Sequence, residues 1–426
     1  MSRCWPRTGP LCVSTAKCTY FTVRTRDLDV RSTISEMRFV LAGIAAFIGL
    51  YIYLDLNKLH ALRYGVDVGI FLQTLVNFAQ HGSTFNWVER LPHLAVHDSW
   101  ALLFLTPIVA LFPRPETLLV IQVGAVASAA IPLYFFARGA GLAALPAQLV
   151  ALVYLIMPST QGWAYMDFSE NVFVPILAFS LALAAQRRSL LWTLVCAQLL
   201  MGVKEDQIWF LAWFGVAGAL WYDRRLGIAV TVLAVVNGAI YYSIVHALGY
   251  APAAPAYSLR LSAWPQDFAF LAEVLAPFAF APLTLGWRIV LAAPLIAEIT
   301  LNGPWAYPLA RAGTHWTVPL VSLIAIGAAV AIARRPMLAR YAFALSILMA
   351  LFFNHATVVR FGRHLCPDET VGYARARADA LSGRRAVYTN NEEGAFVVAS
   401  PNVKVELTGR NDPLLHPKPE WCSKPF

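Results

Sequence analysis

Apolar segments recur along this chain and are separated by short polar connectors that carry glycine, proline or arginine. A helix needs about 20 residues at 1.5 Å each to cross about 30 Å of hydrocarbon. The pattern predicts helical spans over residues 38–56, 117–136, 142–157, 171–186, 189–203, 207–222, 226–246, 268–285, 287–302, 317–333 and 339–354. The run Ala101–Phe112 would be only about 18 Å long as a helix, so we expect that it does not cross.

The composition agrees with a polytopic all-α membrane protein of about 11 transmembrane helices. The chain is 58% hydrophobic and 13% charged, whereas soluble domains carry about 25% charged residues. The net charge of +9 resides in connectors and in the leading segment, so it does not indicate a nucleic-acid partner. The cysteines form no CxxC pair, which argues against a zinc site.

Three regions are predicted. Residues 1–36 are a basic, disordered cytoplasmic leader or an over-extended start before Met37, residues 37–354 are the transmembrane domain, and residues 355–426 are a small exoplasmic α/β tail. The tail pattern indicates a helix over 368–381 and strands over 386–388, 395–399 and 403–407. We expect Cys366 and Cys422 to form a disulfide on the oxidising side; the alternative is two unpaired thiols.

Charge counting sets the orientation. If 101–112 does not cross, nine basic residues fall in cytoplasmic connectors: Arg138, Arg187, Arg188, Arg224, Arg225, Arg288, Arg334, Arg335 and Arg340. The opposite short loops after residue 117 hold only Lys204, Arg260 and Arg311. The positive-inside rule therefore predicts a cytoplasmic N-terminus, an exoplasmic C-terminus and an exoplasmic first loop over residues 57–116, in the cell (inner or plasma) membrane.

The unusual polar residues then share the exoplasmic face. They are Asp67, His93, His97 and Asp98 in the first loop, Asp167 and Glu170 in the next, Lys204, Glu205 and Asp206 in the third, and His315 beside Trp316. Each group has a structural alternative: Asp67 could cap an amphipathic helix over 68–79, His97 and Asp98 a capping turn, and the triplet an internally paired interfacial turn. Ionisable side chains at bilayer depth cost about 2.5–3.5 kcal/mol each, which favours a polar cavity or an aqueous turn.

These motifs resemble a prokaryotic family of predicted membrane proteins, domain of unknown function 2079, over about residues 45–330. The family's D-x-G-I-F-x-Q signature is similar to DVGIFLQ at 67–73, which ends at Gln73. Its following histidine corresponds to His97, its D-F-H-E turn reads DFSE at 167–170, its K-E-D turn is the 204–206 triplet, and its late H-Y pair reads His315-Trp316. Ser169 and Trp316 depart from the family's His and Tyr.

The resemblance implies a relation to lipid-carrier glycosyltransferases of the GT-C fold. By that resemblance Asp67 is the candidate general base or metal ligand in sugar transfer from a polyprenyl-phosphate donor. His97, Lys204 and Arg63 are candidates to hold the donor phosphate, with His315 and Gln73 as further substrate-binding candidates. Asp167, Glu170, Glu205 and Asp206 are hard oxygen ligands suited to Mg²⁺ or Mn²⁺.

Two other functions fit the same sequence. A transporter or channel also uses intramembrane acids and histidines, although we find no internal repeat of the spans. A non-catalytic protein that binds lipid-linked sugars would need the same polar face without a reaction.

Overall fold

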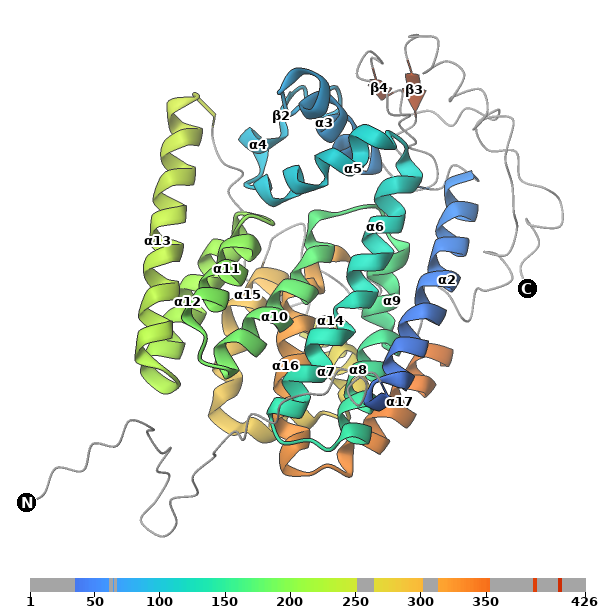
Figure 1. The fold of residues 1–426 in the computed structure, drawn as a ribbon, viewed down its shortest axis with the longest axis vertical. Helices are drawn as coiled ribbons and strands as arrows, with labels where there is room; N and C mark the ends of the chain where they lie inside the picture. Colours follow the sequence, from blue (N-terminus) through green and yellow to red (C-terminus); the bar gives the residue numbers. More distant parts are fainter. Residues whose placement is uncertain are drawn as a thin grey trace, which may run out of the picture. The chain divides into compact units, whose positions relative to one another are not determined.

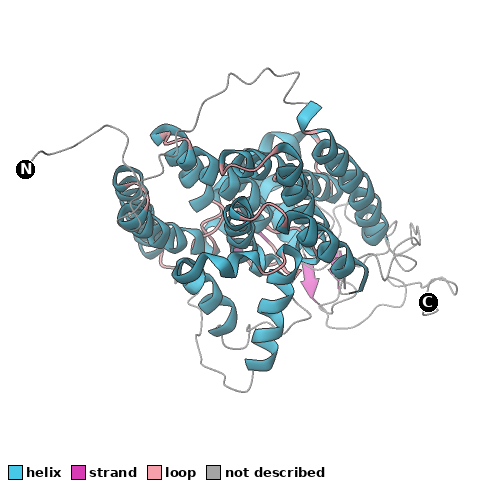
Figure 2. Cartoon of the chain, turned by 90° about the horizontal axis from the view of Figure 1, so that it is seen from below, coloured by secondary structure: helices cyan, strands magenta, loops and turns pink. Residues whose placement is uncertain are grey.

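The computed structural model describes residues 35–60, 64, 67–250, 264–301, 313–352, 386–388 and 405–407. Two compact units are present, Met1–Arg38 and Phe39–Phe426, and nearly all of the described residues belong to the second. Its described part is built almost wholly from helices, as the hydropathy pattern predicts (Figures 1 and 2).

The helices of the first half include or adjoin most of the predicted site residues. They are α2 (Arg38–His60), α3 (Asp67–His81), α4 (His93–Val96), η1 (Trp100–Leu105), α5 (Thr106–Leu111), α6 (Pro115–Ser128), α7 (Ala130–Gly139), α8 (Ala144–Ile156), α9 (Pro158–Tyr165), η2 (Glu170–Phe173), α10 (Val174–Gln186) and α11 (Leu190–Met201). The second half comprises α12 (Asp206–Trp221), α13 (Arg224–Ala247), α14 (Trp264–Leu275), η4 (Ala276–Phe278), η5 (Ala281–Ala292), α15 (Ala293–Leu301), η8 (His315–Thr317), α16 (Val318–Arg334) and α17 (Leu338–Phe352).

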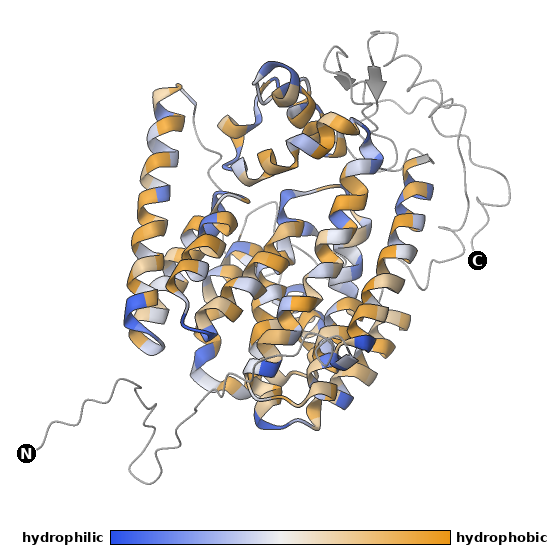
Figure 3. Ribbon diagram, in the orientation of Figure 1, coloured by the Kyte–Doolittle hydropathy of each residue, from blue (hydrophilic) through white to orange (hydrophobic). Residues whose placement is uncertain are grey.

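Five helices of the described residues are long and apolar enough to cross a membrane. They are Arg38–Leu59, Pro115–Gly139, Arg224–Ala247, Ala281–Leu301 and His315–Arg334. A sixth span is possible if α8 and α9, which meet at a bend of 49°, cross as one. The protein is therefore a multi-pass helical membrane protein, while the count of eleven spans stays a prediction. Most of the helical ribbon in Figure 3 has the orange colour of hydrophobic residues.

The predicted span over 268–285 is wrong as one continuous helix. Helix α14 ends at Leu275, and both Ala279 and Phe280 adopt the left-handed backbone conformation, with φ of 51° and 54°. Pro277 and Pro282 flank this break. Because proline has no N–H and interferes with the preceding helical turn, it favours the interruption.

Short helices form where the run 101–112 was predicted not to cross. Segment η1 continues into α5, and the pair counts among the shorter apolar helices. Helix α3 confirms the predicted amphipathic helix over 68–79, and its buried face packs with Leu102 and Val109 in one apolar core. Strands β1 (Phe85–Asn86) and β2 (Leu91–Pro92) form an antiparallel hairpin between α3 and α4.

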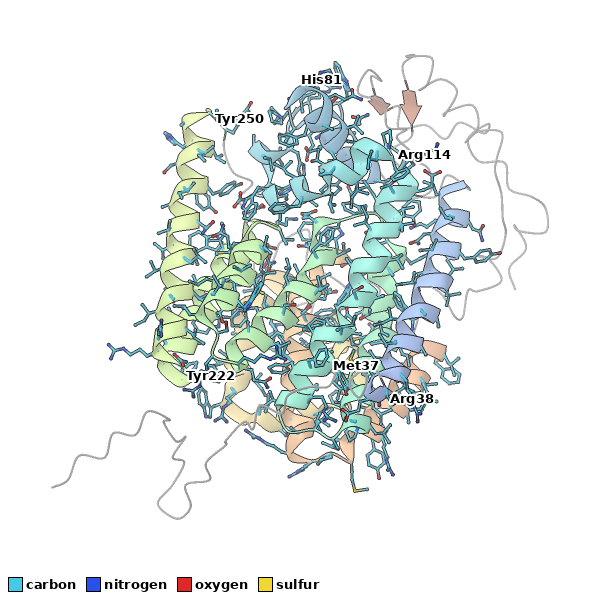
Figure 4. All side chains as sticks on the ribbon, viewed as in Figure 1. Met37, Arg38, His81, Arg114, Tyr222 and Tyr250 are labelled. Carbon is cyan, nitrogen blue, oxygen red and sulfur yellow. The ribbon has the colours of Figure 1, made fainter. Side chains whose placement is uncertain are left out.

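Several connectors meet at one end of the helices, which we call the basic end. The side chain of Gln186 donates to the carbonyl of Phe136 at 3.2 Å, and the hydroxyl of Tyr222 donates to the carbonyl of Ala185 at 3.1 Å. The C-terminal ends of α7, α10 and α12 are thus together. Helix α13 runs from there, near Tyr222, toward Tyr250 at the other end, where His81 and Arg114 also lie (Figure 4).

In the tail, β3 (Ala386–Tyr388) and β4 (Val405–Leu407) pair in parallel. Strand β3 confirms the predicted strand over 386–388, and β4 confirms the second part of that over 403–407. The predicted helix over 368–381, the strand over 395–399 and the Cys366–Cys422 disulfide lie outside the described residues.

Candidate functional site

The charged turn between α11 and α12 holds a buried ion pair. Lys204 Nζ lies 3.2 Å from Glu170 Oε1, with side-chain exposures of 7% and 4%, and 4.5 Å from the ring centre of Trp316. Burial lowers the pKa of Lys204, but the charges of Glu170, Asp206 and Glu205 outweigh it and hold the pKa above its ordinary value. Lys204 is therefore an ammonium ion in a protein interior.

A hydrogen-bonded turn positions Glu170. Ser169 precedes η2 as its N-cap, accepts from the backbone N–H of Asn171 at 3.3 Å, and donates to Glu170 Oε2 at 3.3 Å. Gln122 of α6 accepts from the Ser169 N–H at 3.3 Å and donates to the Met166 carbonyl at 3.1 Å. Ser169 therefore supports the side chain of Glu170.

His97 joins the first loop to the same charged turn. Its Nδ1 lies 2.9 Å from Glu205 Oε1, and Glu205 Oε2 accepts from the backbone N–H of Asp98 at 3.1 Å. Burial lowers the pKa of His97, but the hydrogen bond to Glu205 outweighs it and leaves the pKa above its ordinary value. Burial raises the pKa of Glu205, and the hydrogen bond and charge of His97 bring it below its ordinary value. The pair is an imidazolium–carboxylate contact.

A backbone hydrogen bond and the absence of a side chain at Gly202 complete the contact between the first loop and the 202–206 turn. The N–H of Ala101 donates to the Gly202 carbonyl at 2.8 Å. A Cβ at Gly202 would lie 2.2 Å from Trp100 Cε2, so only glycine lets the indole pack here. The first loop is thus held directly against the 202–206 turn.

Asp67 begins α3 and is one of two acids of the first loop whose pKa lies near neutrality. Burial raises its pKa, the negative charges of Asp167 and Glu170 raise it further, and Lys204 lowers it, which gives a pKa of about 7. Asp98 also reaches a pKa of about 7, through burial and then the charge of Glu205. Carboxyl groups with such values exchange protons at neutral pH.

The sequence reasoning assigned no role to Glu89 or to its pairing with His93. His93 Nδ1 lies 3.0 Å from Glu89 Oε2, which makes a second carboxylate–histidine contact beside that of His97. Glu89 lies in the turn of the β1–β2 hairpin and His93 follows strand β2, so the hairpin brings the two side chains together. Glu298 of α15 was also missed; its charge interacts with Asp206 and Lys204.

The structure brings most predicted site residues together. Interactions or shared charge effects link Asp67, His97, Asp167, Glu170, Lys204, Glu205, Asp206 and His315. Gln73 lies on α3, where its Oε1 accepts from the Trp87 N–H at 3.1 Å. Arg63 lies outside the described residues. Within the described ranges, no three His, Cys, Asp or Glu side chains are grouped to hold a metal ion.

The apolar helices and this buried polar cluster define a multi-pass membrane protein with a charged site at one end of its helices. Residues 58–259, which contain most of the cluster, match the family described as "Predicted membrane protein (DUF2079)". No curated protein matches the chain.

Proposed function

We propose that this protein is an integral membrane glycosyltransferase of the GT-C type that transfers a sugar from a polyprenyl-phosphate donor to an exoplasmic acceptor. The observation that carries the proposal is the placement of Asp67. It combines a pKa of about 7 with a neighbouring buried ammonium on Lys204, so one site offers a proton acceptor and an anion-binding cation.

The reaction needs both groups. The carboxylate of Asp67 takes the proton from the acceptor hydroxyl while its oxygen forms the new bond to the sugar's anomeric carbon. The bond from that carbon to the phosphate oxygen breaks, and the phosphate leaves with the electron pair. Lys204, assisted by the imidazolium of His97, stabilises the phosphate.

The proposed architecture has about 11 spans, a cytoplasmic N-terminus and an exoplasmic site. It is supported by the separation of charge along the helices. Five arginines adjoin the connectors of the basic end: Arg138, Arg187, Arg188, Arg224 and Arg225. Helix α13 runs from this end to the other, and the positive-inside rule assigns the arginine-rich end to the cytoplasm.

Mg²⁺ or Mn²⁺ at Asp167, Glu170, Glu205 and Asp206 stays a prediction. Glu170 is paired with Lys204 and Glu205 with His97, so two of the four carboxylates are already engaged by cations. Activity with and without EDTA, followed by titration of each ion, measures the dependence.

The decisive experiment is transfer by the purified full chain in nanodiscs, with radiolabelled polyprenyl-phosphate sugars and a hydroxyl acceptor. We expect Asp67→Asn to lower turnover at least about 100-fold, because an amide cannot accept the proton. The wild-type rate should rise as the pH increases through about 7, since the base must be ionised.

A matched control is Asp267→Asn, which also changes an acid in the first turn of a helix, α14, without touching the cluster. It should leave transfer unchanged. Wild-type turnover in a folded Asp67→Asn protein would eliminate Asp67 as the base.

A transporter is the second candidate, favoured by Asp55, which is completely buried within the α2 span. Buried intramembrane acids commonly carry protons or ions. Solute or proton flux in liposomes without any lipid-linked donor would support this alternative. A non-catalytic binder would instead bind the donor lipid and show no turnover with any acceptor.

A further inference from the structure

The segment formed by η1 and α5 exposes four large apolar side chains, which we call the apolar stripe. They are Phe104, Ile108, Leu111 and Phe112, with exposed fractions of 65%, 44%, 75% and 58%. The first three recur at intervals of four and three residues, which places them on one side of a helix, and Phe112 follows directly after α5. Exposed apolar surfaces of this kind mark contacts with other proteins or with a membrane.

The opposite side of the same segment is fixed to the protein. Leu102 and Val109 are only 2% and 0% exposed. They share one apolar core with Leu72 of α3 and Leu118 of α6. The segment is therefore apolar on both sides, and only one of these sides is buried in the protein.

No charged residue interrupts this part of the chain. The 15 residues from Ser99 to Pro113 read SWALLFLTPIVALFP, and the charged residues that flank them are Asp98 and Arg114. An interface with a soluble protein carries a polar rim around its apolar centre. An uncharged segment with large exposed apolar side chains instead suits the hydrocarbon of a bilayer.

The chain itself sets the position of the apolar stripe relative to the membrane. Helix α6 begins at Pro115, three residues after Phe112, and it starts the candidate span Pro115–Gly139. The hydroxyl of Thr117 donates to the Phe112 carbonyl at 2.7 Å, which ties the end of the stripe to the first turn of that span. A segment joined so closely to the end of a span lies at the membrane surface.

The direction of the segment fits this position. In Figure 1, η1 and α5 run across the end of α6, whereas α6 runs along the neighbouring helices. The polar part of the same loop lies elsewhere, because Gln80, His81 and Arg90 are exposed at the end of α3 and in the hairpin. His81 lies farther from the helices than Arg114 does (Figure 4). The first loop thus has one part suited to water and another suited to lipid.

We propose that the η1–α5 segment is an interfacial helix whose apolar stripe inserts into the lipid leaflet at this end of the spans. Arg114, exposed at the junction with α6, binds the phosphates of the lipid headgroups. The inference goes beyond the proposed function and does not depend on it, because it rests on the exposed side chains and on the adjoining span.

Insertion of the stripe also determines where the charged turn lies. A Cβ at Gly202 would lie 2.2 Å from Cε2 of Trp100, the first residue of η1, and the N–H of Ala101 donates to the Gly202 carbonyl at 2.8 Å. The inserted segment and the 202–206 turn are therefore in direct contact. The segment holds this turn, and Lys204 with it, near the headgroup region of the bilayer.

Spin-label depth measurements on the full chain test the insertion, in nanodiscs of phosphatidylethanolamine and phosphatidylglycerol. In a background whose cysteines are changed to serine, Phe104→Cys and Leu111→Cys each carry a nitroxide at an exposed position of the stripe. Both labels should be more accessible to oxygen than to a water-soluble nickel chelate, at a depth of about 5–10 Å. The two depths should be nearly equal, whereas a helix that crosses the membrane would separate them by about 10 Å.

Two controls belong to the same loop. His81→Cys places the label at an exposed position in the polar part, where the nickel chelate should reach it freely. Val109→Cys places it on the buried side of α5, where neither reagent should reach it.

Three results would overturn the proposal. Access of the nickel chelate to Leu111→Cys equal to that of His81→Cys would place the stripe in water. Protection of both stripe positions from both reagents would show that protein, such as a second copy of this chain, covers the stripe. Depths that differ by about 10 Å would show that the segment crosses the leaflet. None of these results bears on sugar transfer, which the turnover assay tests separately.

Discussion

The two ends of the helices each hold an ion pair between a basic side chain and a carboxylate, and the two pairs differ in kind. At the basic end, Arg188 lies 3.8 Å from Asp223, with exposures of 59% and 18%. At the other end, Lys204 and Glu170 lie 3.2 Å apart and are almost fully buried. Exposed pairs contribute about 0–1 kcal/mol, whereas burying two charges costs several kcal/mol before their attraction repays it.

The comparison indicates what each charge is for. The exposed arginines need only be cationic on the correct side of the membrane, where they help to set the orientation. Lys204 and Glu170 lie in a place where apolar residues would pack with less desolvation cost. The buried pair is therefore weak evidence for stability, and the proposed function gives it a role.

The largest effect should be an all-or-none difference in labelling between the two ends. In a background whose cysteines are changed to serine, His81→Cys and Tyr222→Cys place single exposed thiols at opposite ends (Figure 4). An impermeant maleimide added to intact cells should label the first variant and not the second. Labelling of Tyr222→Cys alone would invert the proposed orientation.

The second largest effect should be the loss of stability when one partner of the buried Lys204–Glu170 pair is removed. Lys204→Met leaves the carboxylate of Glu170 buried and uncompensated, so the free energy of unfolding should fall by about 3–5 kcal/mol. Unfolding in detergent measures it. Arg188→Met is the control and should cost at most about 1 kcal/mol. The double variant Lys204→Met/Glu170→Leu should regain most of the loss; a double variant as unstable as the single one would contradict this account.

The smallest effect concerns the partly exposed His97–Glu205 pair. The pKa of His97 is raised above 6.5 and that of Glu205 is lowered below 4.5. The contribution of this pair to the free energy of unfolding is therefore complete between pH 4.5 and pH 6.5. It is lost as pH rises through the folded pKa of His97 and as pH falls through that of Glu205.

The melting temperature of the wild type should thus fall more steeply above pH 6.5 than that of His97→Gln. The difference corresponds to at most about 1 kcal/mol, because the pair is partly solvated. His81→Gln should keep the wild-type slope. Parallel curves for the wild type and His97→Gln would remove His97 as the titrating group.

Much of the fold was predictable from hydropathy, because an apolar run of sufficient length has few alternatives to a buried or membrane-crossing helix. The helix over 67–81 and the short segments over 100–111 follow from local pattern alone. The break at Ala279 and Phe280 was not predicted, since the residues around it are uniformly apolar. Only the flanking prolines gave a signal there.

The candidate site was predictable as a set of residues but not as a set of partners. The motifs named Asp67, His97 and the 204–206 triplet. The contact of His97 with Glu205 joins residues 108 positions apart, so no local spacing encodes it. The contact of His93 with Glu89 spans only four positions, but it depends on the β1–β2 hairpin, which the sequence pattern did not predict.

The sequence by itself determined that this is a helical membrane protein with its arginines in connectors and its mixed charges gathered in a few turns. Hydropathy and charge are properties of the residues themselves, so they can be read from the sequence without knowledge of the fold. The tertiary structure alone decided that Lys204 pairs with Glu170, that Asp67 lies among like charges, and that His93 presents an unpaired Nε2. Those properties depend on burial and on neighbours distant in the chain, and packing creates both.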